Sequence, residues 1–219
     1  MRILVDSADL SAINTALASG FVAGVTTNPT LLRRAGVQAR AVPELARQIL
    51  AAGAGELHLQ AFGSSADDML REGRALVALD PARVWVKLVA TPAGYQAAAS
   101  LAAEGVRVTL TAVYTPRQAL LAQSVGARAV AIYLGRMRDA GLDALALAGQ
   151  MQAILRAQHA EVQILAASIR APEELDALAA LGVASATIAP PVLAQLLDSD
   201  ATARAAAGFA DDARAMFEE

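Results

Sequence analysis

The sequence predicts one (β/α)8 barrel of the TIM type, and three observations carry this prediction. Short apolar segments alternate with longer helix-like segments from one end of the chain to the other. About eight such pairs fit into the 219 residues, which makes a lean barrel. No linker, low-complexity tract or run of like charge divides the chain. Residues 1–219 are therefore expected to form a single domain.

The predicted strands are short and rich in Val, Ile, Leu and Ala. In chain order they are Ile3–Val5, Ala23–Val25, Glu56–Ala61, Val84–Leu88, Val106–Leu110, Ala129–Tyr133, Gln163–Ala166 and Ala184–Ile188. An alanine-rich or amphipathic helix follows each strand, and a short extra helix is expected around Arg33–Ala35, before the helix at Val42–Ala52. An open doubly wound sheet is the alternative fold. It is disfavoured because no Gly-rich dinucleotide loop follows the first strand.

Turn residues punctuate this alternation. Several glycines precede strands and fit the left-handed position that ends a helix: Gly20, Gly105, Gly126 and Gly182. Three prolines that follow strands suit the first turn of the next helix: Pro92, Pro116 and Pro172. Ser65 and Asp68 have the spacing of a capping box.

The composition excludes several classes of function. The chain has 18 basic and 21 acidic residues and a net charge of −3, which leaves no basic surface for nucleic acid. It has no cysteine, so disulfides, thiolate metal sites and a cysteine nucleophile are excluded. His58 and His159 are the only histidines, too few for a three-histidine zinc site. No metal and no cofactor are expected.

A mean hydropathy of +0.42 raises the question of a membrane protein. Two uncharged stretches, Leu10–Leu32 and Ala177–Leu197, are broken by Gly, Pro and polar residues, whereas a span needs about 20 apolar residues in one helix. Asp6 stands where a secretory signal would need its apolar run. We therefore expect a cytoplasmic protein without membrane contact. The low charge suggests a large core, an oligomer, or both.

Polar residues gather at the predicted carboxyl ends of the strands, which is where barrel enzymes place their active sites. These residues are Asp6, Thr26, Thr27, Asn28, Gln60, Lys87, Thr109, Thr111, Tyr133, Arg136, Ser168 and Arg170. Two uses compete for such positions, capping of the following helix and chemistry. For Asp6 both uses stay open. For Arg136 and Arg170, with Ser168, the alternatives are phosphate binding and simple exposure to solvent.

Lys87 is the chain's single lysine, since 17 of the 18 basic residues are arginine. It stands among apolar residues within a predicted strand. A desolvated lysine loses its proton readily and becomes an amine nucleophile, which arginine cannot do. A lysine at a strand edge that reaches solvent, or a buried lysine paired with Asp6, is the structural alternative. His58 is expected to be a core histidine or an interface residue.

Three segments resemble the signature segments of the small transaldolase family, which includes short transaldolases and fructose-6-phosphate aldolases. They are Ala23-Gly-Val-Thr-Thr-Asn-Pro-Thr-Leu31, Val84-Trp-Val-Lys-Leu88 and Ala166-Ala-Ser-Ile-Arg170. The first is highly specific, and the resemblance extends from Met1 to the C-terminal helix. It implies a (β/α)8 barrel, as the strand count does independently.

The resemblance also implies roles for individual residues. Lys87 matches the Schiff-base lysine, and Asp6 matches an aspartate of proton transfer. Asn28 and Ser168 match residues that hold donor hydroxyls, and Thr27 belongs to the same substrate-binding motif. Arg136 and Arg170 match positions that bind the sugar phosphate, and Thr111 matches a threonine that holds a catalytic water.

Two further positions separate the branches of the family. Gln60 and Tyr133 follow the aldolase pattern, where transaldolases have glutamate and phenylalanine. The implied function is therefore a class I aldolase that makes or cleaves fructose 6-phosphate from dihydroxyacetone and glyceraldehyde 3-phosphate. Transaldolase, with erythrose 4-phosphate as acceptor, is the alternative. A sugar-phosphate sensor and an oligomeric scaffold are alternatives from other classes, and neither needs a nucleophilic Lys87.

The resemblance implies an assembly as well. Small members of the family are often ring-shaped homo-oligomers, which makes a pentamer or decamer the expectation here. Residues 199–219 are expected to form a C-terminal helix that packs on a neighbouring subunit.

Overall fold

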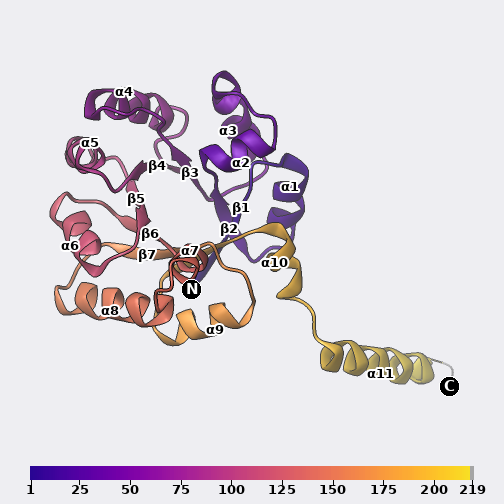
Figure 1. The fold of residues 1–219 in the computed structure, drawn as a ribbon. Helices are drawn as coiled ribbons and strands as arrows, with labels where there is room; N and C mark the ends of the chain where they lie inside the picture. Colours follow the sequence, from indigo (N-terminus) through magenta and orange to yellow (C-terminus); the bar gives the residue numbers. More distant parts are fainter. Residues whose placement is uncertain (218–219) are drawn as a thin grey trace.

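Eight parallel strands close into a barrel in the computed structural model, which describes residues 1–217 (Figure 1). Each strand pairs with the next one in sequence, and β8 pairs with β1 to close the ring. The strands are β1 (Arg2–Asp6), β2 (Val22–Thr26), β3 (Glu56–Gln60), β4 (Val84–Val89), β5 (Val108–Val113), β6 (Ala129–Tyr133), β7 (Gln163–Ala167) and β8 (Ser185–Ile188). The predicted fold class is confirmed.

Helices surround the barrel on its outside (Figure 1). They are α1 (Leu10–Ala18), α2 (Pro29–Arg34), the 3₁₀ turn η1 (Ala39–Ala41), α3 (Val42–Ala51), α4 (Ala66–Val77), α5 (Pro92–Ala103), α6 (Pro116–Ser124), α7 (Leu134–Asp139), α8 (Ala144–Ala157), α9 (Glu173–Ala180), α10 (Pro190–Gln195) and α11 (Asp200–Phe217). The extra helix expected after the second strand is α2.

Most of the predicted turn signals are present. The four glycines Gly20, Gly105, Gly126 and Gly182 have φ between +74° and +80°. Pro92 and Pro116 begin α5 and α6, whereas Pro172 stands one residue before α9. Ser65 caps α4 by accepting from the Asp68 N–H, but the Asp68 carboxylate accepts from the Ser65 hydroxyl rather than from the Ser65 backbone.

The prediction for the fifth strand was wrong at both ends. We expected Val106–Leu110, and the strand runs over Val108–Val113. Val106 belongs to the cap of α5, because its N–H donates to the Leu101 carbonyl at 3.0 Å after the left-handed Gly105. At the other end, pairing with β6 shifts register between Leu110 and Val113 and continues beyond that irregularity.

The layer between strands and helices and the interior of the barrel contain different kinds of side chain. Between the strands and the helices lies the large apolar core, which includes Leu57, Val86, Leu110 and Ile132. Alternate strand residues point to the other side, into the barrel. There the apolar cluster is only Leu4, Ala131 and Leu165 with Tyr133 beside it. The strands also carry buried polar side chains, which are Thr26, Glu56, His58, Lys87, Thr109, Thr111, Ser185 and Thr187.

Helix α11 extends away from the barrel, as Figure 1 shows. None of its described residues is buried, and Phe209, Met216 and Phe217 are 72%, 79% and 89% exposed. The helix predicted over residues 199–219 is thus present from Asp200, while residues 218–219 lie outside the described part. Within residues 1–217, no helix has both the length and the apolar character that crossing a membrane requires.

Candidate active site

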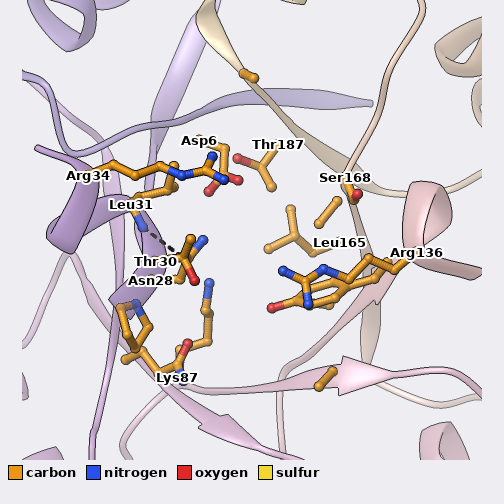
Figure 2. Close-up of a pocket in the computed structure, with 17 residues that line it drawn as sticks. Asp6, Asn28, Thr30, Leu31, Arg34, Lys87, Arg136, Leu165, Ser168 and Thr187 are labelled. Atoms are coloured by element: carbon orange, nitrogen blue, oxygen red, sulfur yellow. Dashed lines mark hydrogen bonds between the residues drawn. The ribbon is translucent and has the colours of Figure 1, made fainter. Parts of the chain in front are cut away.

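A cavity of about 450 Å³ opens at the carboxyl ends of the strands (Figure 2). Polar residues from seven of the eight strand ends or the turns after them line it, together with apolar residues such as Ala131 and Leu165. The polar strand-end residues are Asp6, Asn28, Gln60, Lys87, Tyr133, Ser168 and Thr187. Parallel strands of a barrel deliver their ends to one face, which brings these sequence-distant residues together.

Lys87 lies on β4 and points into the cavity (Figure 2). Its side chain is buried, and its ammonium nitrogen Nζ donates a hydrogen bond to the Thr27 carbonyl at 2.9 Å. Burial lowers the pKa of the Lys87 amine, and the nearby charge of Asp6 only partly opposes this. Since no carboxylate among the described residues lies within ion-pair distance of Lys87, the alternative of a lysine held in a direct salt bridge is excluded there.

Asp6 ends β1 and does not cap a helix. Asp9 caps α1 instead, by accepting from the Ala12 N–H at 3.0 Å. Asp6 accepts a hydrogen bond from the Thr26 hydroxyl at 2.7 Å, and Thr26 also contacts the Thr187 hydroxyl at 2.7 Å. Burial raises the pKa of the Asp6 carboxyl, against the opposing influence of Lys87 and Thr26. Asp6 can therefore exchange a proton inside the cavity.

Tyr133 stands at the end of β6 and lines the cavity. Its hydroxyl is 2.8 Å from the Thr111 hydroxyl. Burial raises the pKa of the Tyr133 phenol, so that it keeps its proton at neutral pH. The Arg136 guanidinium lies over the ring, 5.3 Å from its centre. Tyr133 is thus an oriented proton donor beside a cation.

Asn28 has two roles. Its side-chain oxygen caps α2 by accepting from the Leu31 N–H at 3.0 Å, and the residue also lines the cavity. Because the oxygen is used for the cap, the side-chain NH₂ group remains as a donor for a ligand. The helix cap therefore fixes the position of a potential substrate contact.

Gly135 permits a close approach between the start of α7 and the loop after β7. Its N–H donates to the Ser168 carbonyl at 3.0 Å, and a Cβ at this position would lie 2.6 Å from that oxygen. Ser168 itself has φ +59°, an uncommon conformation for serine. This contact places Ser168 next to Arg136 at the cavity wall.

The ten predicted site residues take three kinds of position: in the cavity lining, in contact with a lining residue, or outside the lining. Seven line the cavity: Lys87, Asp6, Tyr133, Gln60, Asn28, Ser168 and Arg136. Thr111 contacts Tyr133, and Thr27 contributes its carbonyl to Lys87 while its own hydroxyl is buried without a partner. Arg170 is not part of the lining. Its guanidinium donates two hydrogen bonds to Asp139, one of them at 2.8 Å.

The sequence analysis missed three polar lining residues, Thr30, Arg34 and Thr187. The position of Thr187 near the end of the last predicted strand is a sequence signal that could have identified it as a lining residue. For Arg34 the signal was spacing, because Asn28, Leu31 and Arg34 recur every three residues and all line the cavity.

Below Lys87 the barrel contains a second polar layer around His58, which is in the core as expected. The imidazole nitrogen Nδ1 is 2.9 Å from the Thr109 hydroxyl, and the ring stacks on Trp85 with 4.9 Å between centres. The other nitrogen, Nε2, has no hydrogen-bond partner and lies 3.8 Å from Glu56. Burial lowers the pKa of the His58 imidazole, which keeps the ring neutral.

The chain is similar to known proteins over almost its whole length. The model of the family described as Transaldolase/Fructose-6-phosphate aldolase matches residues 3–219. A probable transaldolase of Halalkalibacterium halodurans is 36% identical over 90% of this chain and 91% of its own length. A probable transaldolase of Rhodospirillum centenum is 36% identical over 97% of this chain and 90% of its own length. A variant of mandelate oxidase superposes with a TM-score of 0.64 at 16% identity over 88% of this chain and 66% of its own, which shows the fold alone.

The neutral state of His58 predicts a loss of stability in mild acid. Its pKa is below the ordinary 6.5 in the folded chain, so the unfolded chain binds the proton more readily as pH falls through 6.5. Between pH 7.5 and 5.5, His58 is expected to reduce the free energy of unfolding by about 1 kcal/mol. Urea denaturation at the two pH values measures this loss.

The chain provides a matched control, because its other histidine, His159, is exposed. His58→Asn should remove this part of the pH dependence, whereas His159→Asn should retain it. A wild-type pH dependence in His58→Asn would contradict the assignment.

Proposed function

Because this chain belongs to the transaldolase/fructose-6-phosphate aldolase family, we propose that it is a Schiff-base aldolase that cleaves and forms fructose 6-phosphate. The partner molecules are dihydroxyacetone and glyceraldehyde 3-phosphate. The observation that carries the proposal is the buried amine of Lys87 in a cavity that also contains Asp6 and Tyr133. A buried amine, a carboxyl of raised pKa and an oriented phenol are the groups that this reaction needs.

Lys87 carries the covalent step. Burial favours its neutral form, which adds to the ketone carbon C2 of the sugar. Loss of water gives an iminium ion on the Lys87 nitrogen. This cation accepts the electron pair of the C3–C4 bond as that bond breaks, and an enamine and an aldehyde result.

Tyr133 and Asp6 move the protons. In the condensation direction, the phenol of Tyr133 donates its proton to the aldehyde oxygen that becomes the C4 hydroxyl, and cleavage follows the same path in reverse. Thr111 orients that phenol. Asp6 exchanges protons during loss of water from the Lys87 adduct and at C3 of the enamine. Thr26 supports this role because its hydroxyl holds the carboxyl at 2.7 Å.

Arg136 is proposed to bind the phosphate of the aldehyde. Arg136 makes no ion pair within residues 1–217, so its guanidinium can donate to a phosphate. Arg170 is tied to Asp139, and it contributes only when a phosphate replaces that carboxylate. Asn28 and Ser168 are proposed to bind the hydroxyl groups of the donor, and Gln60 with Thr111 to hold a catalytic water. Thr27 acts on Lys87 through its carbonyl.

Transaldolase activity is the second candidate, and the names of the relatives favour it. Both activities share the enamine on Lys87. Protonation of the enamine releases dihydroxyacetone, whereas capture by an aldose completes a transfer. Gln60 and Tyr133 line the cavity, and both follow the aldolase pattern. Tyr133 supports the aldolase because its phenol can donate a proton, which a phenylalanine at this position could not do.

A neighbouring copy of the chain is the proposed partner of α11. This proposal is supported by the exposure of Phe209, Met216 and Phe217, since a helix of this kind gains stability by covering its apolar residues. The pathway of such an enzyme is that of sugar phosphates, and the proposed location is the cytoplasm.

Borohydride reduction in the presence of dihydroxyacetone tests the covalent step. The wild type should gain one reduced adduct in its intact mass, and Lys87→Arg should gain none while its thermal unfolding stays cooperative. Turnover in Lys87→Arg should fall about a thousandfold or more. Because Lys87 is the only lysine, an adduct that survives the substitution to the same extent can only lie on the N-terminal amine and would contradict the assignment of the covalent step to Lys87. A sensor or scaffold predicts no adduct at all.

Fructose 6-phosphate supplied with and without erythrose 4-phosphate separates the two activities. An aldolase should release glyceraldehyde 3-phosphate in both conditions, with dihydroxyacetone in equal amount when no acceptor is present. Release that requires the acceptor would assign the transaldolase instead. A coupled assay for the triose phosphate gives the rate in each condition.

Phe209→Asp should weaken the proposed assembly, because it puts a charge on the apolar face of α11. The molar mass from light scattering should fall toward that of one chain, 22.5 kDa. Asp211→Ala is the control, because two residues further along a helix is the opposite face. A single-chain mass in the wild type, or the same oligomer in Phe209→Asp, would contradict the role of α11.

A further inference from the structure

Two guanidinium groups reach into the cavity from different walls, and in Figure 2 Arg34 enters from the upper left and Arg136 from the right, with Lys87 below. Arg136 comes from α7, and its partner, the terminal phosphate, is part of the proposed function. Arg34 comes from the last turn of α2. No carboxylate of residues 1–217 lies within ion-pair distance of Arg34, and no described group accepts a hydrogen bond from it. The proposed function does not use this cation.

The lining contains one guanidinium group more than a single phosphate bound by Arg136 would use. Arg34, Lys87 and Arg136 are its basic residues, and Asp6 is the only acidic one. When Lys87 is neutral, Asp6 and one phosphate still face two guanidinium groups. Guanidinium and phosphate form strong, bidentate hydrogen bonds. A phosphate bound by Arg136 leaves the donors of Arg34 without an acceptor, so the cavity can bind a ligand with a second anionic group.

The orientation of the substrate decides where that second group would lie. In the proposed reaction, C2 of the sugar is bound to Lys87, and C4 faces Tyr133. The terminal phosphate then lies beyond C4, toward Arg136. C1, on the other side of C2, faces the opposite wall, which is formed by Asn28, Thr30 and Arg34.

We propose that Arg34 is the centre of a second anion subsite, which binds a phosphate on C1 of the donor. The chain would then cleave ketoses that carry a phosphate at both ends, and it would take dihydroxyacetone phosphate as a donor. This inference rests on the proposed Schiff-base function. Asn28 assists, because its side-chain NH₂ group remains free for a ligand while its oxygen caps α2.

The local fold directs Arg34, and not its neighbour, to the cavity. Asn28 fixes the first turn of α2, and Leu31 and Arg34 follow at intervals of three residues on the same side of the helix. Arg33 lines a different hollow, with Val37 and Phe62. The two adjacent arginines carry the same charge in the same helical turn, yet only one of them faces Lys87.

The reaction with such a substrate balances without any further reagent. Lys87 adds to C2 and water leaves. The C3–C4 bond breaks and its electron pair passes to the enamine, while the C4 hydroxyl proton is relayed through the Tyr133 hydroxyl to Asp6, which gave up its proton when water left. The aldehyde phosphate departs. Protonation at C3 and addition of the water then release dihydroxyacetone phosphate and regenerate the amine of Lys87.

Borohydride trapping at graded concentrations of dihydroxyacetone and dihydroxyacetone phosphate tests the subsite. The readout is the ratio of the two concentrations that give half-maximal adduct, measured by intact mass. Arg34→Gln should change this ratio about tenfold at the expense of the phosphate, since one charge-assisted contact is lost. Arg33→Gln removes the same charge from the same turn and should leave the wild-type ratio.

The outcomes separate the two proposals. A preference for the phosphate in the wild type and in Arg33→Gln, lost in Arg34→Gln, supports the subsite. Adducts with dihydroxyacetone but none with its phosphate would overturn the subsite and leave the aldolase intact. A ratio that is the same in wild type and Arg34→Gln would also overturn it. Adducts with neither compound would overturn both proposals.

Discussion

The burial of one amine is the constraint on which the rest of this site depends. A lysine amine keeps its proton in water, and it becomes a nucleophile at neutral pH only where the charged form is destabilised. The closed barrel supplies that environment without leaving a strand edge unpaired. The cost of burying polar groups is then met by partners on neighbouring strands. The Thr27 carbonyl accepts from Lys87, the Thr26 hydroxyl donates to Asp6, and Thr109 contacts His58.

The motif Thr26-Thr27-Asn28-Pro29 is specific because each of its four positions has its own physical task. Thr26 holds Asp6 with its side chain, while Thr27 holds Lys87 with its backbone. Asn28 caps α2 and faces the cavity, and Pro29 begins the helix, where its missing N–H has no consequence. A substitution at one position therefore disturbs either Lys87, Asp6 or the wall of the cavity. Local turn chemistry and site geometry cannot be separated here.

The architecture and most of the lining could be predicted from the sequence. Strand alternation and glycine and proline signals depend on residues that are close in the chain, and β6 was predicted at both ends. The predictions that were wrong concern residues whose contacts are distant in the sequence. Nothing near Arg170 in the sequence indicates that Asp139, 31 residues earlier, binds its guanidinium. Likewise, the register shift in β5 depends on how that strand pairs with β6. The direction of Arg34 also required the orientation of α2 on the barrel.

The separation of the apolar core from the barrel interior has a consequence for how this fold can change. Most barrels of this type fill their interior with branched apolar side chains, which then contribute to stability. Here the apolar contacts lie mainly between strands and helices, while the interior holds hydroxyls, an imidazole and an amine. The polar residues of the barrel interior thus occupy different positions from the apolar residues that hold the chain together. A substitution inside the barrel can change which molecule reacts while the packing between strands and helices stays the same. Such substitutions therefore need no earlier substitution that raises the stability of the fold.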